Sequence, residues 1–285
     1  MEIFRAVKDM QAWAGERRRR GLIIGFVPTM GYLHSGHVSL MTYARKRCDR
    51  LVVSIFVNPT QFNNPDDLSR YPRDLERDLA SIRPVPVDAV FHPAPEEMYP
   101  AGFQTYVEVT GLSQGLCGAD RPGHFRGVTT VVAKLFLAVN PHLAVFGEKD
   151  FQQLKVIQRM TRDLGFEIEV VGRPTFREPD GLAMSSRNVH LKPAERQSAL
   201  ALSESLRLAQ DLADRGTVSA EGLLAAVRAH IEARPFARVE YAVLVDPETL
   251  TDAPRLEDRA LLALAVTVGK TRLIDNAMLT TRSGS

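Results

Sequence analysis

Two histidines, His34 and His37, stand three residues apart on either side of Gly36, in the segment that follows an apolar run over 22–27. On the first turn of a helix, this spacing puts both imidazoles on one face, where they can hold an oxyanion or supply a proton. Gly31 and Gly36 permit close backbone approach, and the N–H groups at a helix start attract phosphate. The spacing differs from the His-x-x-x-His pair of helical zinc sites, and no nearby carboxylate completes a ligand set. This segment therefore predicts a phosphate-binding loop.

Other polar side chains follow later apolar runs. Gln61 can both donate and accept hydrogen bonds, which suits a hydroxy-acid substrate. Arg121 and His124 lie in a glycine-flanked loop, and a plain turn would not explain their presence. Lys149 is placed as a point charge for phosphate, whereas Asp150 either caps the next helix or binds a ribose. Together these groups predict a polar site that binds an anionic substrate.

A polar loop over 180–188 carries hydroxyls and a guanidinium, from Ser185, Ser186 and Arg187. Such a loop either closes over a triphosphate and shields the reaction from water, or is only a polar linker. Two standard nucleotide motifs are absent. Gly269-Lys270-Thr271 lacks the earlier glycine of a Walker A loop, and no Gly-x-Gly-x-x-Gly follows a predicted strand.

The elements that must position these groups alternate in the first part of the chain. Short apolar runs are separated by amphipathic helical patterns, which is typical of a parallel sheet covered on both faces. We therefore predict a doubly wound, Rossmann-like α/β domain, in which ligands bind beyond the carboxyl ends of the strands. The predicted strands are 22–27, 51–57, 87–91, 105–109, 143–146 and 167–171.

The pattern changes after about residue 175. Two Ala/Leu-rich helical segments are followed by three apolar strand patterns, which indicates a separate, smaller α+β domain. We predict a catalytic domain over 1–175 and a lid domain over 176–285.

Composition excludes several other classes. Lys and Arg number 36 against 34 Asp and Glu, so the formal charge of +2 gives no argument for nucleic acid or a membrane surface. We interpret Arg17–Arg20 as a solvated helix end. The apolar stretch Ala260–Val268 is too short to span a bilayer, and the first residues lack a signal-type segment, so we expect a cytoplasmic protein. Cys48 and Cys117 stand alone and are expected to be structural thiols.

The His34-Ser35-Gly36-His37 string resembles the His-x-Gly-His signature of nucleotidyltransferases related to class I aminoacyl-tRNA synthetases. With four further motifs in order along the chain, the sequence resembles the pantothenate synthetase family. The five motifs are 28–37, 56–62, 124–128, 146–153 and 184–188. The ending 271–276 also resembles that family's C-terminus.

The resemblance implies an ATP-dependent ligase that activates pantoate as pantoyl-adenylate and then transfers it to β-alanine, with Mg²⁺ on the nucleotide and a homodimeric assembly. It implies that His34, His37 and Lys149 are catalytic, with His37 as proton donor. Gln61 and Gln153 would bind pantoate, and Gln61, His124 and Arg121 would bind β-alanine. Asp78 is a candidate metal ligand. The implied ATP site comprises Met30, Gly31, Tyr32, Leu33, His34, Ser35, Gly36, His37, Gly147, Glu148, Lys149, Asp150, Phe176, Met184, Ser185, Ser186 and Arg187.

Three positions depart from the family's pattern. Phe176 replaces a small aliphatic residue where backbone touches adenine, and Tyr32 and Ser35 replace the more usual Ala and Glu. Two rival readings stay open: a nucleotidyltransferase that keeps the nucleotide on its product, and a nucleotide-binding module without catalysis. The two glutamines favour the ligase. The catalytic groups argue against the module, because a sensor needs no transition-state contacts.

Overall fold

The structure, a computed structural model, describes residues 1–216, 219–253 and 259–281. Its contacts divide the chain into two compact units. The first unit comprises residues 1–148 and 152–174, and the second comprises 149–151 with 175–285. A three-residue segment from the middle of the chain thus groups with the C-terminal part.

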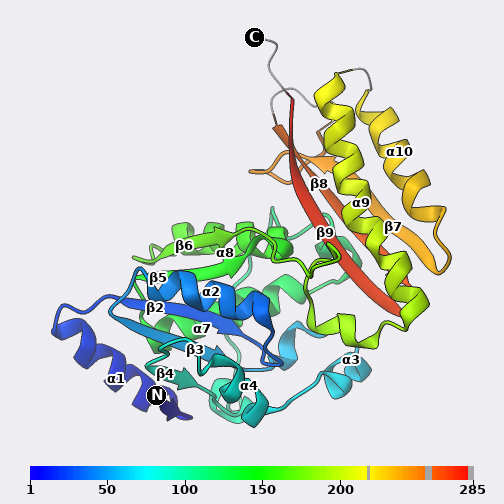
Figure 1. Cartoon of the computed structure of the whole chain (residues 1–285). Coiled ribbons are helices and arrows are strands. Elements are labelled where there is room, and N and C mark those ends of the chain that lie inside the picture. Colours follow the sequence, from blue (N-terminus) through cyan, green and yellow to red (C-terminus); the bar gives the residue numbers. More distant parts are fainter. Residues whose placement is uncertain (217–218, 254–258, 282–285) are drawn as a thin grey trace. The chain divides into compact units, whose positions relative to one another are not determined.

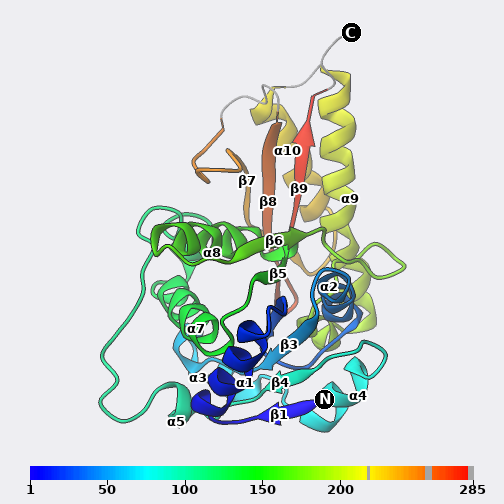
Figure 2. The ribbon, with the colours of Figure 1, turned by 90° about the vertical axis from the view of Figure 1, so that its left-hand side faces the viewer.

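The first unit is built on a six-stranded parallel sheet in the order β1-β4-β3-β2-β5-β6 (Figures 1 and 2). From β2 the chain proceeds through β3 and β4 in one direction, and then returns to β5 on the other side of β2. This reversal places a topological switch point between β2 and β5, and it confirms the predicted doubly wound α/β class. The strands are β1 Glu2–Phe4, β2 Ile24–Thr29, β3 Arg50–Ile55, β4 Ala89–Phe91, β5 Leu143–Gly147 and β6 Glu169–Arg173.

Helices cover both faces of this sheet because its central strands are apolar on both sides. Phe26 packs in one core with α1 (Val7–Arg19), α7 (His124–Val139) and α8 (Phe151–Asp163). The next residue of β2, Val27, packs in a second core with α2 (Ser35–Arg45) and α4 (Leu75–Ile82). The shorter helices are α3 Pro65–Arg70, α5 Pro95–Met98 and α6 Cys117–Asp120, with 3₁₀ turns η1 Pro59–Gln61 and η2 Glu148–Asp150.

The prediction of a strand over 105–109 is wrong. The segment forms no regular secondary structure, because hydroxyls of helix α7 bind its backbone groups. Val107 N donates to Thr130 Oγ1 at 3.0 Å, and Thr129 Oγ1 donates to Val107 O at 2.5 Å. Backbone groups engaged in this way are not available to a neighbouring strand. The sixth strand is instead β1, Glu2–Phe4, which pairs with β4.

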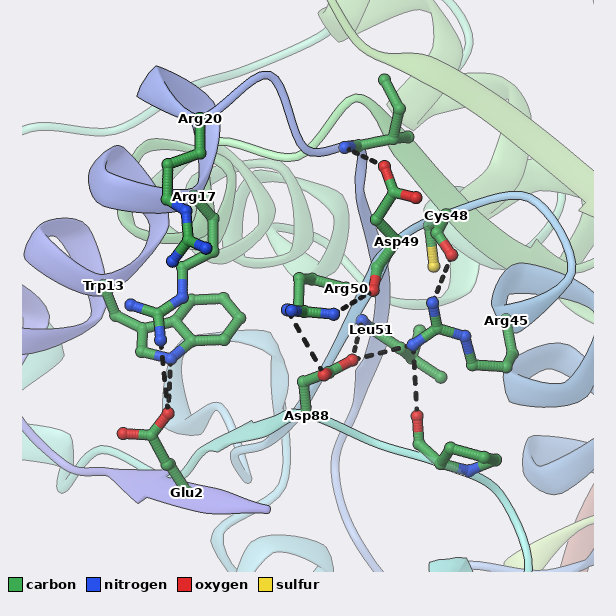
Figure 3. A network of polar contacts seen from close by, with 12 residues as sticks. Glu2, Trp13, Arg17, Arg20, Arg45, Cys48, Asp49, Arg50, Leu51 and Asp88 are labelled. Carbon is green, nitrogen blue, oxygen red and sulfur yellow. Dashed lines mark hydrogen bonds and ion pairs between the residues drawn. The ribbon is translucent and has the colours of Figure 1, made fainter.

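Charged side chains pair with one another near the amino ends of β2, β3 and β4 (Figure 3). The carboxylate of Asp88 lies 2.8 Å from Arg45 Nη1 and 3.6 Å from Arg50 Nε, and it accepts the N–H of Leu51. The basic run predicted to end a helix does end α1, but Arg17 is not only solvated, because its guanidinium lies 4.5 Å from the ring centre of Trp13.

The second unit packs helices α9 (Pro193–Arg215) and α10 (Ala220–Glu232) against an antiparallel sheet, as the predicted α+β class requires. Its strands are β7 Ala237–Val245, β8 Arg259–Val268 and β9 Thr271–Thr280, in that order. Gly269, at φ +60°, and Lys270 form the two-residue turn between β8 and β9. A hairpin turn explains the Gly-Lys-Thr string without any role for phosphate.

None of the helices in the described ranges is long and apolar enough to cross a membrane. Within the same ranges, Cys48 and Cys117 are both thiols that form no disulfide.

Candidate active site

Two loops of the first unit leave the sheet at its carboxyl edge. Thr29 of β2 is paired with Ile55 of β3, so the segments that follow them emerge side by side. The first begins at Met30 and leads into α2, and the second begins at Phe56 and contains η1. This is the edge at which open parallel sheets bind ligands.

The loop after β2 is held by a buried carboxylate. Asp78 of α4 is 1 % exposed, and its two oxygens accept the N–H groups of Tyr32 at 2.8 Å and Leu33 at 2.7 Å. Burial raises the pKa of Asp78, an effect that the two backbone hydrogen bonds and Arg77 only partly offset. Gly31 adopts a φ of +84°, and a Cβ there would lie 2.9 Å from Asp78 Oδ2. The loop conformation therefore depends on the Gly31 backbone and on Asp78 together.

His34 and His37 lie together at the start of α2. Their ring centres are 4.0 Å apart, and the His34 N–H donates to His37 Nδ1 at 3.3 Å. Because Nδ1 accepts, a neutral His37 ring carries its hydrogen on Nε2. Ser35 is exposed and Gly36 is buried within the first turn. The spacing argument is thus confirmed in its geometry, while the chemical roles of the two rings stay predictions.

The loop after β3 is organised by buried Asn58. Its Nδ2 donates to Gln61 Oε1 at 3.0 Å and to the carbonyl of Gly127 at 3.1 Å. Its Oδ1 accepts from Tyr99 OH at 2.7 Å and from Thr60 Oγ1 at 3.0 Å. Gln61 is itself buried, and its Nε2 lies 3.0 Å from the sulfur of Met30, which brings the two loops together.

Arg121 and His124, both predicted from the sequence, meet at the backbone carbonyl of Gln61. That oxygen is 2.8 Å from His124 Nδ1 and 3.2 Å from Arg121 Nη2. Arg121 Nη1 also lies 3.2 Å from His124 Nε2. A guanidinium only donates, so this pairing requires an unprotonated Nε2 and places the ring hydrogen on Nδ1. The structure brings these two side chains to the predicted substrate glutamine.

The predicted residues after β5 divide between the two units. Gly147 ends β5 beside Arg173 of β6, and Glu148 follows in η2, both in the first unit. Gln153 lies on the first turn of α8 and is partly exposed. Lys149 and Asp150 belong to the second unit, where the Lys149 carbonyl accepts a hydrogen bond from Asn276 Nδ2 at 2.9 Å.

The motif over 184–188 forms an ordered turn in the second unit. Ser185 Oγ accepts the N–H of Arg187 at 3.3 Å and caps the 3₁₀ turn η3, Ser186–His190. Buried Asn188 anchors it by donating to Glu178 Oε1 at 2.7 Å and Ala183 O at 3.1 Å. Phe176 is exposed, and its carbonyl accepts the N–H of Met184 at 2.9 Å. The segment is therefore more than a polar linker within its own unit.

Four residues of this site were given no role by the sequence analysis: Asn58, Thr60, Tyr99 and Gly127. Gly127 lies within the motif over 124–128. Asn58 and Thr60 lie within a motif that the sequence pointed to, and their position after a strand could have marked them. Tyr99 follows α5 and carries no such signal. Its place beside Asn58 depends on a contact over 41 residues of chain.

A parallel sheet with a glycine loop and a helix N-terminus at its switch point defines a Rossmann-like α/β protein. The comparisons give the particular family. The family model described as pantoate-beta-alanine ligase matches residues 2–278, and the chain belongs to this family.

Individual relatives agree over nearly the whole chain. The chain is 55% identical over 279 residues to the pantothenate synthetase of Geobacter sulfurreducens, covering 98% of this chain and 99% of that protein. The crystal structure of pantothenate synthetase from Thermus thermophilus is 47% identical, with a TM-score of 0.91 over 97% of this chain and 99% of that one. A Francisella tularensis pantoate-beta-alanine ligase, complexed with beta-gamma ATP and beta-alanine, is 36% identical with a TM-score of 0.80 over 98% and 97%.

Proposed function

We propose that this protein condenses pantoate with β-alanine at the expense of ATP, by way of a pantoyl-adenylate. The observation that carries the proposal is the loop over 30–37, whose backbone Asp78 holds by two hydrogen bonds and which leads into the histidine pair at the switch point. Membership in the pantoate-beta-alanine ligase family over residues 2–278 supports pantoate, β-alanine and ATP as the substrates.

The order of the two steps follows from the chemistry. A carboxylate is a poor electrophile, so its oxygen first attacks the α-phosphorus of ATP, and the bond from that phosphorus to pyrophosphate breaks. The amine of β-alanine then attacks the acyl carbon of the resulting mixed anhydride. The bond to AMP breaks, the nitrogen loses a proton, and an amide remains.

The groups proposed to act on phosphate lie mainly in the loop after β2. Backbone N–H groups at the start of α2 and the two imidazoles stabilise charge that develops on the phosphate oxygens. His37 serves as a proton donor, consistent with a hydrogen on Nε2. The assignments of Gly147, Glu148, Phe176 and Met184 to the nucleotide rest on the family resemblance. Those of Lys149, Asp150 and Ser185–Arg187, and of a closing lid to the second unit, rest on that resemblance together with the residue types and their positions in the sequence.

Gln61 and Gln153 are the proposed contacts to pantoate. Gln61 is fixed by Asn58, so its amide is ready before substrate binds. His124 and Arg121 are proposed to lie at the β-alanine end, next to the Gln61 carbonyl that they contact.

Mg²⁺ is proposed to bind together with the nucleotide, because it offsets phosphate charge. Among the described residues, no group of three or more His, Cys, Asp or Glu side chains could form a protein cage for a metal. Asp78 stays the predicted protein ligand, although its two oxygens already accept hydrogen bonds from the loop.

The test uses pantoate labelled with ¹⁸O in its carboxylate, mixed with the enzyme, ATP and Mg²⁺, with and without β-alanine. The proposal predicts pantoate-dependent pyrophosphate release, and one ¹⁸O atom in AMP when β-alanine is added. A nucleotide that stays on the product would favour the rival transferase. If no pantoate-dependent pyrophosphate is released, the result would favour the nucleotide-binding module without catalysis.

Two further properties are proposed, the first from the family resemblance and the second from the sequence pattern. These are a homodimeric assembly and a cytoplasmic location, and a sedimentation measurement at several protein concentrations tests the first.

A further inference from the structure

The side-chain amide of Asn58 uses its full hydrogen-bonding capacity inside the protein. An amide nitrogen has two donors and its oxygen two acceptor sites. Nδ2 donates to Gln61 Oε1 and Gly127 O, and Oδ1 accepts from Tyr99 OH and Thr60 Oγ1. Asn58 is 1 % exposed. A buried amide with four partners has one stable orientation.

The identity of the partners fixes which end of each amide faces which way. A backbone carbonyl only accepts, so the Asn58 atom beside Gly127 O is the nitrogen. The same nitrogen lies beside Gln61, so the Gln61 atom facing it is the oxygen. The Gln61 nitrogen then points away from Asn58, toward the sulfur of Met30. Thioether sulfur is a weak acceptor, which a substrate oxygen readily replaces.

We propose that Tyr99 is a positioning residue which, through Asn58, presents the N–H groups of Gln61 to substrate oxygens. The inference rests on the proposed function and deepens it. Gln61 then binds the hydroxyl or carboxylate oxygens of pantoate and, when it meets β-alanine, the carboxylate end of that molecule. It does not hold the amine, which stays available for attack on the acyl group.

The surroundings of Tyr99 suit a permanent donor. Its ring lies between Phe56 and Phe103, with ring centres 6.4 and 5.1 Å away. Burial raises the pKa of Tyr99 to about 12, although the hydrogen bond with Thr60 acts in the opposite direction. The phenol therefore keeps its proton at any ordinary working pH, and it can always donate to Asn58 Oδ1 at 2.7 Å.

The first test is Tyr99→Phe, assayed by pantoate-dependent pyrophosphate release. Loss of one hydrogen bond to a buried acceptor should raise the KM for pantoate by roughly ten-fold, while the KM for ATP changes less than about two-fold. Tyr106→Phe is the matched control, because Tyr106 makes an edge-to-face contact with the same Phe103 ring but is 50 % exposed. An unchanged pantoate KM, or equal changes in both KM values, would overturn the inference.

A double-mutant cycle separates positioning from general structural damage. In a Gln61→Ala background Tyr99→Phe should have almost no further effect on the pantoate KM, since Tyr99 acts through Gln61. A further ten-fold rise there would show that Tyr99 acts elsewhere.

If Tyr99→Phe does not fold, Asn58→Asp gives a second route. It turns the donor facing Gln61 and Gly127 into an acceptor, and should raise the pantoate KM by at least about 50-fold. An unchanged KM in that variant contradicts the orientation argument. If the wild-type enzyme releases no pyrophosphate in response to pantoate, the proposed function is refuted. If the wild type is active but the variants keep its pantoate KM, only this inference is refuted.

Discussion

The two edges of the sheet in the first unit use polar groups in different ways. At the amino edge, opposite charges pair with one another: Asp88 binds Arg45 and Arg50 (Figure 3). At the carboxyl edge, the buried polar groups bind mainly the backbone N–H groups and side-chain amides of the loops that follow the strands. Asp78 holds the N–H groups of the β2 loop, and Asn58 holds the side chain of Gln61.

This difference separates stability from recognition. In an ion pair, each side chain neutralises the charge of the other, so few of their hydrogen-bonding groups remain for a ligand. A buried group that holds a loop or an amide in one orientation determines where the remaining donors point, which is a form of preorganisation. We therefore expect substitutions at the amino edge to change stability alone, and those at the carboxyl edge to change substrate binding or turnover as well.

The largest expected contrast is between two histidines that both accept a backbone N–H. His37 Nδ1 accepts from His34 at the carboxyl edge, and His142 Nδ1 accepts from Ile24 at the amino edge. His37→Ala should lower the adenylation rate by roughly 10² or more, as loss of a charge-stabilising group does, and we expect the same of Lys149→Ala. His142→Ala should lower only stability, by about 1 kcal/mol. Pyrophosphate release measures the rate effect, and urea unfolding measures the stability effect.

Near-normal turnover of the His37→Ala variant would contradict the proposed role of His37.

A smaller effect is expected from crowding the β3 loop. A Cβ on Gly127 would overlap Thr60 O and lie 2.7 Å from Gln61 N, both backbone atoms that cannot move aside cheaply. Gly127→Ala should destabilise the protein by about 1–3 kcal/mol and raise the pantoate KM by at least about ten-fold. Gly111→Ala is the control, because a Cβ there meets no atom within 4 Å. Equal results for the two variants would show that the loop adapts.

Two aspartates test the comparison directly. Asp78→Asn turns one hydrogen-bond acceptor into a donor that faces a loop N–H, so we expect about 2 kcal/mol of destabilisation and a five- to ten-fold higher KM for ATP. Asp88→Asn weakens a partly buried ion pair and should cost about 1 kcal/mol with no change in either KM. If Asp78→Asn instead shifts only the Mg²⁺ concentration needed for half-maximal rate, Asp78 is a metal ligand as the sequence suggested.

The sequence predicts those parts of the molecule that depend on neighbouring residues. The apolar runs gave five of the six strands in the parallel sheet, and glycines beside histidines marked the β2 loop. The strand predicted over 105–109 failed because Thr129 and Thr130, some 20 residues away, take the backbone groups of Val107. Strand β1 has only three residues, which is too short for an alternating pattern.

The same distinction applies to the site. Gln61 could be selected because it lies in the loop that follows a predicted strand. The contacts that orient it come from Tyr99 and Gly127, which are 41 and 69 residues from Asn58 in the chain. Contacts between residues so far apart in the chain cannot be predicted from a single sequence. The loop role of Asp78 was missed for the same reason, since 45 residues separate it from Leu33.

The smallest predicted effect concerns Cys48, a thiol near the amino edge that follows α2. Burial raises its pKa above the ordinary value of 9.0, although Arg45 acts in the opposite direction. A Cβ on Gly25 would lie 2.7 Å from its sulfur, so the thiol is packed against β2. In a Cys117→Ala variant, we expect iodoacetamide to react at pH 8 at least about five-fold more slowly with the folded chain than with the urea-unfolded chain.

The sign of the pH effect on Cys48 follows from that shift. Because the folded pKa is the higher one, the stability that Cys48 contributes is complete below about pH 9 and is lost as pH rises through the folded pKa. Cys48→Ser should remove this alkaline loss in urea unfolding, with turnover unchanged. Rapid alkylation that also abolishes pyrophosphate release would place a reactive group at the amino edge, and the division between a structural edge and a functional edge would then fail.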